Sequence, residues 1–94
     1  EERAPEQVIE LVRDFHARME RAVFAHGGTI DKYIGDAVMA TFGTPRTSGR
    51  DAGASLRCAR AMVESVDDWN AERERRGLPV VRCGVGVHYG AVVL

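Results

Sequence analysis

The sequence predicts an α/β domain whose elements follow in the order helix, strand, strand, helix, strand. Two long segments repeat apolar residues at the spacing of an amphipathic helix. Between them lie two short runs rich in apolar and β-branched residues, separated only by Gly35-Asp36, and a further short apolar run follows the second helical segment. These observations favour two helices packed against a small sheet.

The first predicted helix covers about Pro5 to His26. Proline suits the first turn of a helix, and Gly27-Gly28 suits its end. Its apolar residues form one stripe that we expect to pack in the core: Val8, Leu11, Val12, Phe15, Met19, Ala22 and Val23. Acidic residues mixed into the polar face argue against a helix that lies on a membrane surface.

The second predicted helix covers about Asp51 to Arg76 and ends before Gly77-Leu78-Pro79. We expect its buried side to be formed by Leu56, Ala59, Met62, Val63, Val66 and Trp69. The arginines near its C-terminus are most simply solvated cations that complement the helix dipole. Thr44 to Arg50 is expected to be a connecting loop, and the final strand is expected near Val80 to Leu94.

Thr29 to Ile34 and Ala37 to Phe42 are expected to form a tight hairpin, because a two-residue connection of this kind is typical of hairpin turns. If Ile34 pairs with Ala37, then Lys32 pairs with Met39 and Ile30 with Thr41. Since side chains alternate along a strand, one face then carries Ile30, Lys32, Ile34 and Met39, and the other carries Tyr33, Val38, Ala40 and Phe42.

Lys32 and Asp36 are the candidate functional residues of this hairpin. A lysine among apolar neighbours is costly to desolvate without an acceptor, which favours a ligand or partner that supplies one. Lys32 is the only lysine among 13 basic residues, and Asp36 projects a carboxylate from the end of the sheet. Plainer interpretations stay open, because Gly-Asp is common turn chemistry and strand lysines are commonly solvated or protect a sheet edge.

At these residues the sequence resembles the catalytic domain of class III nucleotidyl cyclases, the adenylate and guanylate cyclases. Their core signature, Lys-x-Ile-Gly-Asp-x-x-Met-Ala before a Phe-Gly, is matched by Lys32, Ile34, Gly35, Asp36, Met39, Ala40, Phe42 and Gly43. The flanks agree, with His26-Gly27-Gly28 before the hairpin and a last run reading Gly84-Val-Gly-Val-His88-Tyr-Gly90. The resemblance covers nearly the whole chain and implies a ferredoxin-like α/β sandwich.

The resemblance implies that Asp36 is a catalytic residue and one of two aspartates that bind a pair of divalent cations, Mg²⁺ or Mn²⁺. It implies that Lys32 selects adenine, because guanylate cyclases typically carry Glu there, and that Ile34 and Gly35 belong to the same substrate-binding segment. The implied reaction is attack of the ribose 3′-hydroxyl of ATP on the α-phosphate, giving cyclic AMP and pyrophosphate. One chain with both Lys32 and Asp36 resembles a homodimer-forming type with active sites at the interface.

The sequence departs from the family pattern at both ends. It lacks a strand like Phe-x-Asp-Ile-x-Gly-Phe-Thr, which carries the other metal-binding aspartate, and it reaches Leu94 before the second base-selecting residue and the Asn and Arg that support the transition state. We therefore expect residues 1–94 to be a partial catalytic domain, without its central first strand, and inactive alone. A catalytically silent cyclase-homology module for dimerisation or regulation is the alternative, and a guanylate cyclase is a further one that Lys32 disfavours.

Other functional classes have less support. A formal charge of −1 gives no general attraction to nucleic acid or anionic lipid. No apolar run is long enough to span a membrane, so we expect a cytoplasmic segment, whose parent protein could be attached to a membrane elsewhere. Cys58 and Cys83 lack metal-binding spacing and are expected to be free and to pack as small apolar groups, and the three histidines form no ligand cluster. Neither a dinucleotide fingerprint nor a phosphate loop occurs.

Overall fold

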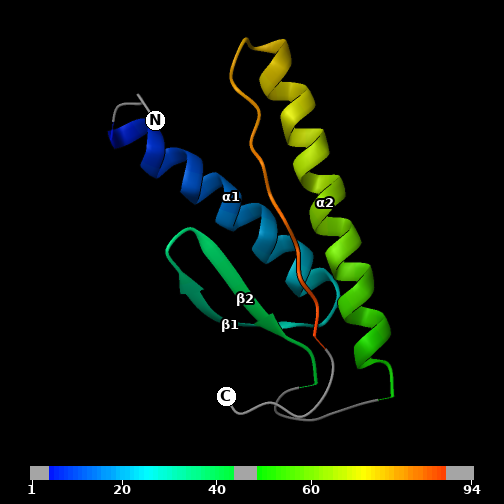
Figure 1. Cartoon of the computed structure of the whole chain (residues 1–94). Coiled ribbons are helices and arrows are strands. Elements are labelled where there is room, and N and C mark those ends of the chain that lie inside the picture. Colours follow the sequence, from blue (N-terminus) through cyan, green and yellow to red (C-terminus); the bar gives the residue numbers. More distant parts are fainter. Residues whose placement is uncertain (1–4, 44–48, 89–94) are drawn as a thin grey trace.

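The computed structural model describes residues 5–43 and 49–88 (Figure 1). Within these ranges the chain forms α1 (Pro5–Ala25), β1 (Thr29–Ile34), β2 (Ala37–Thr41) and α2 (Asp51–Arg75). The strands pair antiparallel in a two-stranded sheet, which lies beside the C-terminal half of α1 (Figure 1). The α/β class and the first four elements are therefore confirmed, with each helix ending one residue earlier than predicted.

Both helices end in the same backbone motif. After α1, Gly27 has a φ of +75° and the N–H of Gly28 donates to the carbonyl of Val23 at 2.9 Å. After α2, Gly77 has a φ of +72° and the N–H of Leu78 donates to the carbonyl of Arg73 at 2.8 Å. These are the bonds of a Schellman motif, whose left-handed residue favours glycine. The two glycines stop the helices, as the sequence predicts.

A small core lies where the two helices meet the hairpin. Val23 is 0% exposed and Cys58 is 1% exposed, with Ala22 beside them. Partly buried residues from the hairpin and α2 pack around this centre: Ile30, Ala40, Phe42, Ala61 and Met62. Cys58 is a free thiol whose pKa is raised by burial, and Cys83 is free and exposed. Cys58 packs in the core as a small apolar residue, as expected, but the expectation that Cys83 does the same is wrong, because it lies on the exposed segment after α2.

Away from this core, the helices are joined by contacts around Trp69, which is 6% exposed. The guanidinium of Arg18 from α1 lies 5.0 Å from the centre of the indole ring and donates to the carbonyl of Ser65 at 3.5 Å. The guanidinium of Arg73 lies 5.5 Å from the same ring. Cations stack on an indole face because the ring carries negative potential there, so Trp69 links the two helices.

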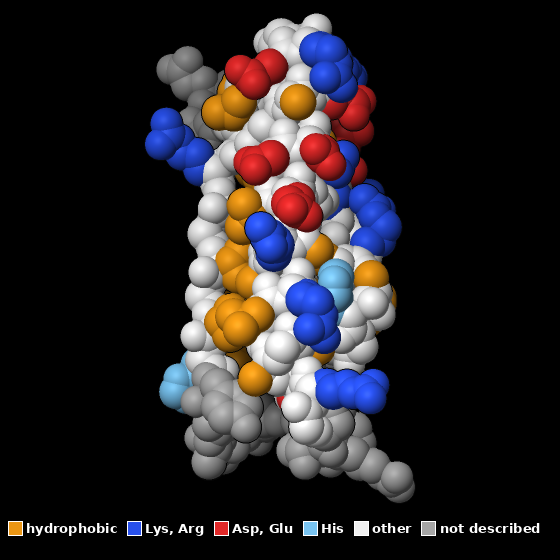
Figure 2. Space-filling view, turned by 90° about the vertical axis from the view of Figure 1, so that its right-hand side faces the viewer, with side chains coloured by type: hydrophobic (Ala, Val, Ile, Leu, Met, Phe, Trp, Pro, Cys, Tyr) orange, Lys and Arg blue, Asp and Glu red, His pale blue; other side chains and the backbone are white. Residues whose placement is uncertain are grey.

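The apolar side of α2 is only partly covered. Cys58, Val66 and Trp69 are buried, but Leu56 is 61% exposed and Val63 is 47% exposed. The expectation that these two residues are buried is wrong in this structure, because α1 and the hairpin cover a narrower arc than the apolar stripe of α2. Figure 2 shows hydrophobic side chains open to solvent on this side of the molecule.

Residues 78–88 do not form the predicted final strand. They run back along α2 without strand pairing (Figure 1), and residues 89–94 lie outside the described part. A strand requires a neighbouring backbone to exchange hydrogen bonds with, and the described hairpin pairs only with itself. Most of the predicted loop, residues 44–48, also lies outside the described part. Among the described residues, no helix is both long enough and apolar enough to cross a membrane.

Candidate functional site at the hairpin tip

Asp36 lies at the tip of the hairpin, directly after Gly35. Gly35 has a φ of +60°, whereas Asp36 does not have a positive φ. Glycine at the first central position with this geometry is typical of a type II′ turn, whose twist matches that of the flanking strands. The pairs Ile34–Ala37 and Lys32–Met39 follow from it, so the predicted register at the tip is confirmed.

The register shifts between Ile30 and Lys32. Ile30 pairs with Ala40 rather than with Thr41, and Asp31 is the additional residue of a β-bulge. Ile30 therefore joins Ala40 on the side that packs against the core. The prediction that Ile30 shares a face with Lys32 is wrong, because the bulge allows an isoleucine to be buried against Val23 and Cys58 instead of lying in solvent.

The face that carries Lys32 points away from α1 and is open. Ile34 is 60% exposed and Met39 is 39% exposed, and the side chain of Lys32 is 59% exposed. The lysine Nζ lies 3.8 Å from the carboxylate of Asp31, an ion pair that contributes little in solvent. Lys32 does have apolar neighbours, as predicted, but in this structure it is not desolvated.

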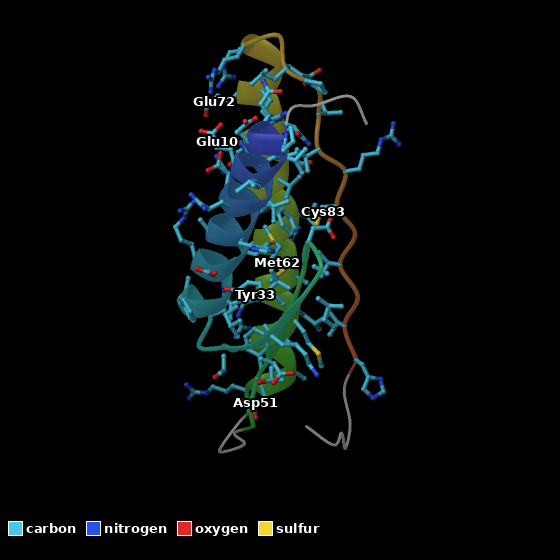
Figure 3. The ribbon with its side chains drawn as sticks, turned by 90° about the vertical axis from the view of Figure 1, so that its left-hand side faces the viewer. Glu10, Tyr33, Asp51, Met62, Glu72 and Cys83 are labelled. Carbon is cyan, nitrogen blue, oxygen red and sulfur yellow. The ribbon has the colours of Figure 1, made fainter. Side chains whose placement is uncertain are left out.

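The opposite face of the tip is attached to α1. Tyr33 is labelled in Figure 3 beside α1. Its ring lies 4.6 Å from the imidazole of His16, measured between ring centres, and its hydroxyl donates to the carboxylate of Glu20. The Nε2 atom of His16 lies 3.1 Å from the backbone carbonyl oxygen of Asp36. The pKa of Tyr33 is raised because Glu20 accepts its hydroxyl hydrogen, and burial and the carboxylate charge act in the same direction.

Sequence reasoning missed the involvement of His16, which looked like an ordinary histidine within a helix. One local signal was available. His16 and Glu20 are four residues apart and therefore lie on the same face of α1. Two polar side chains on a face that otherwise contributes to an apolar stripe indicate a polar partner, and the partner is the hairpin tip.

The predicted site residues Lys32, Ile34, Gly35 and Asp36 all lie at one end of the hairpin. The carboxylate of Asp36 is a hard oxygen ligand of the kind that Mg²⁺ and Mn²⁺ prefer. Among residues 5–43 and 49–88, however, no three His, Cys, Asp or Glu side chains gather around one point. Asp36 thus fits one ligand of a divalent cation site, and the described residues do not complete such a site.

A shallow groove lies elsewhere, between α2 and the segment that follows it. It has a volume of about 330 Å³ and is lined by Val63, Val66, Asp67, Asn70, Val81, Arg82 and Cys83. None of these is one of the four predicted site residues. Arg82 is exposed at this groove and has no assigned role.

Comparison with known proteins identifies the family. Residues 1–94 match the model of the adenylate and guanylate cyclase catalytic domain. Adenylate cyclase 1 of Rhizobium meliloti is 34% identical over 94 residues, which are 100% of this chain and 14% of that protein. An adenylate cyclase of Anabaena cylindrica is 37% identical over 94 residues, 96% of this chain and 18% of that protein.

A solved structure agrees with the sequence comparisons. The crystal structure of the guanylyl cyclase Cya2 superposes with a TM-score of 0.76 and 28% identity, over 84% of this chain and 40% of that one. The present chain spans less than a fifth of the length of each of the two adenylate cyclases. With its whole length matched and its cyclase signature on one hairpin, the chain belongs to the adenylate and guanylate cyclase catalytic domain family.

Proposed function

We propose that residues 1–94 are a segment of an adenylate cyclase catalytic domain that converts ATP to 3′,5′-cyclic AMP and pyrophosphate. The observation that carries this proposal is the placement of Lys32 and Asp36 at the same end of one hairpin, both open to solvent. Each of the two side chains is open to a nucleotide, or to a second subunit, without any rearrangement of the described core. The names of the two adenylate cyclase relatives support the same activity.

In this proposal Asp36 is the catalytic residue and a ligand of two divalent cations, Mg²⁺ or Mn²⁺. Bound cations would lower the pKa of the ribose 3′-hydroxyl and offset the negative charge that develops at the phosphate. The chain contributes an anionic carboxylate on an exposed turn. The described residues hold no cluster of three or more such ligands, so the proposed site needs a second metal-binding carboxylate in addition to Asp36.

Lys32 is proposed to select adenine. Its ammonium group donates hydrogen bonds and accepts none, which suits the acceptor nitrogen N1 of adenine better than the N1–H of guanine. Ile34 and Gly35 are proposed to contact the substrate beside it. Ile34 offers an exposed apolar side chain, and the space where a side chain of Gly35 would begin is empty for 4 Å, so a ligand can come close to the backbone.

We also propose a homodimer with two equivalent sites, each taking Asp36 from one subunit and Lys32 from the other. The exposed apolar side chains of Ile34 and Met39 lie on the face of Lys32, and burying such a surface favours association. A closed twofold arrangement is the commonest one for identical chains. Because ATP is an intracellular nucleotide, we propose that this domain works in the cytoplasm.

A catalytically silent module for dimerisation or regulation is the second candidate. It is favoured by the same finding that leaves the metal site incomplete among the described residues. Against it stands the presence of both Lys32 and Asp36, for which a silent copy has no chemical need.

The test is cyclic nucleotide formation from ATP and from GTP with Mn²⁺, using the full-length protein, its Asp36→Ala variant and an Asp68→Asn control on the exposed side of α2. Cyclic AMP made by the wild type and the control but not by Asp36→Ala supports the cyclase proposal. No product from a folded dimer supports the silent module, and cyclic GMP as the main product contradicts the choice of ATP.

A further inference from the structure

We propose that His16 is a positioning residue for Asp36, which it holds from α1 through the backbone of the hairpin turn. The inference rests on the proposed function, because it concerns the direction in which the Asp36 carboxylate points. It assigns a part in the site to a helix residue that the cyclase signature does not include.

His16 is the donor in its hydrogen bond with Asp36. The Nε2 atom of His16 lies 3.1 Å from the carbonyl oxygen of Asp36, within the usual range for a hydrogen bond. A carbonyl oxygen only accepts, so the imidazole must carry its hydrogen on Nε2 for this bond to form. The contact therefore selects the ring form in which Nε2 is protonated, a state that can be observed directly.

The imidazole ring of His16 is held in place by its neighbours. Its centre lies 4.6 Å from the centre of the Tyr33 ring, with the two planes inclined by 43°. The hydroxyl of Tyr33 in turn donates to Glu20, one helical turn after His16 on α1. The ring of His16 cannot swing away without losing both its contact with the tilted Tyr33 ring and its bond to Asp36, so α1 presents a fixed donor to the turn.

The position of the Asp36 carbonyl group affects the direction of the Asp36 side chain. The carbonyl group of Asp36 belongs to the peptide plane that follows its Cα, so holding its oxygen restricts rotation about ψ of Asp36. Gly35 precedes it with a φ of +60° and offers no side-chain contact that would restrict the turn. Beyond the pairing of the two strands, the bond from His16 is what ties Asp36 to the rest of the described structure. The direction of the Cα–Cβ bond of Asp36 is therefore set in part by α1.

The placement of the Asp36 carboxylate should affect the rate of the proposed reaction. A metal ligand displaced by about 1 Å can cost on the order of a hundredfold in rate, because catalysis depends on the relative placement of the reacting groups. His16 touches neither nucleotide nor cation in this proposal. It acts through Asp36, and its loss should lower kcat while the KM for ATP stays nearly unchanged.

The experiment separates the donor from the ring. In the full-length protein, His16→Phe keeps a ring to stack on Tyr33 but removes the donor, whereas His16→Gln keeps an N–H donor and removes the ring. His16→Ala removes both. Arg13→Ala, an exposed basic residue one turn earlier on α1, is the matched control that should behave as wild type.

Hydrogen exchange of the hairpin is measured first, in the full-length protein without metal or nucleotide. We expect roughly tenfold faster exchange at the turn in the Ala and Phe variants, with the Gln variant closer to wild type, since one lost hydrogen bond of about 1.4 kcal/mol is a tenfold change in an opening equilibrium. Nitrogen chemical shifts of labelled His16 should report a protonated Nε2. Among the His16 variants, those with the fastest hydrogen exchange at the turn should have the lowest kcat for cyclic AMP formation.

Two results would overturn the proposal. If His16→Phe protects the turn as well as wild type does, ring packing and not the hydrogen bond positions it. If no variant changes exchange at the turn, His16 does not hold it at all. These outcomes are independent of the cyclase proposal: a wild type that makes no cyclic nucleotide removes the proposed function, while the exchange data still decide whether His16 fixes Asp36.

Discussion

The side-chain amide of Asn70 on α2 makes two hydrogen bonds with the backbone of Val81. Its Nδ2 donates to the carbonyl oxygen at 2.7 Å, and its Oδ1 accepts from the N–H at 2.7 Å. An amide side chain offers one acceptor and donors much as a peptide group does, so Asn70 stands in for the backbone of a neighbouring strand. Nearby, Nε of Arg73 donates to the carbonyl of Pro79 at 2.7 Å. The segment after α2 is thus held by helix side chains.

Replacing Asn70 by Asp should loosen this segment locally. The carboxylate keeps an acceptor for the N–H of Val81 but loses the donor to its carbonyl, which costs about 0.5–1.5 kcal/mol for one hydrogen bond. We expect roughly tenfold faster hydrogen exchange at Val81 to Cys83 in the variant. Glu74→Gln, an exposed change on the same helix, serves as the control. Equal exchange in both variants would show that the two hydrogen bonds of Asn70 are not needed to hold the segment.

The isolated 94-residue chain should neither unfold cooperatively nor make cyclic AMP. Ile34, Leu56 and Val80 are each between 47% and 61% exposed, and apolar surface left in water contributes no burial free energy and promotes association. We expect broad thermal transitions by circular dichroism and elution as aggregates. A sharp transition from a soluble monomer, or cyclic AMP made by this monomer, would contradict the expectation.

Replacing Lys32 by Glu in the full-length protein should reduce the use of ATP more than the use of GTP. A carboxylate accepts hydrogen bonds where the ammonium donates them, so it opposes the adenine N1 and suits the N1–H of guanine. Because a base without its matched polar partner is rejected, we expect the ratio of kcat/KM for ATP to kcat/KM for GTP to fall by at least about tenfold. The measurement is kcat/KM for both nucleotides, with Arg13→Glu as an equal charge change away from the hairpin. An unchanged ratio would remove Lys32 from base selection.

Gly28→Ala should destabilise the junction of α1 and the hairpin. An added Cβ would lie 2.7 Å from the Phe42 ring and 2.9 Å from a methyl group of Val23, closer than real Cβ contacts come. Overpacking of this kind typically costs about 1–3 kcal/mol. Gly84→Ala is the matched control, since a Cβ there meets nothing within 4 Å. In the full-length protein, the melting temperatures of the two variants should differ clearly, and equal melting temperatures would mean that Phe42 moves aside at little cost.

Tyr33 should ionise at higher pH than an ordinary tyrosine. The Glu20 carboxylate accepts its hydroxyl hydrogen, so its pKa lies above the usual 10.0. Because the pKa in the folded state is raised, the contribution of this contact is fully present below pH 10.0 and is lost as the pH rises through the pKa of the folded state. Ultraviolet titration of the full-length protein against its Tyr33→Phe variant isolates this group, because the difference between the two curves contains the signal of Tyr33. If the signal lost in the variant titrates at or below the usual pKa, the Glu20 bond is absent in solution.

Local patterns predicted the parts of this structure that local interactions govern. The turn at Gly35-Asp36 determines which residues pair next to it, so the pairs Ile34–Ala37 and Lys32–Met39 could be read from the sequence. Farther from the turn this reasoning fails at Ile30. Burial against Val23 and Cys58, which lie on two different helices, stabilises a bulge that shifts its pairing by one residue.

Three other misses have the same origin. Leu56 belongs to the apolar stripe of α2, but how much of a stripe is buried depends on how widely the neighbouring elements cover it. The segment near Val81 has strand-like composition, yet without a paired backbone it stays an irregular segment that Asn70 holds. The link from His16 to Asp36 spans 20 residues, so the spacing of His16 and Glu20 on α1 indicates a polar partner without identifying which residue it is.

By itself, the sequence determined the two helices, the glycines that end them, the hairpin turn and the positions of Lys32 and Asp36 near its tip. Each follows from backbone preferences and side-chain types within a few residues. Only the tertiary structure decided which face Ile30 takes, how much of α2 is covered and which helix residue holds Asp36. Those outcomes depend on burial and on single hydrogen bonds between distant segments, whose free energies exist only once the elements have packed together.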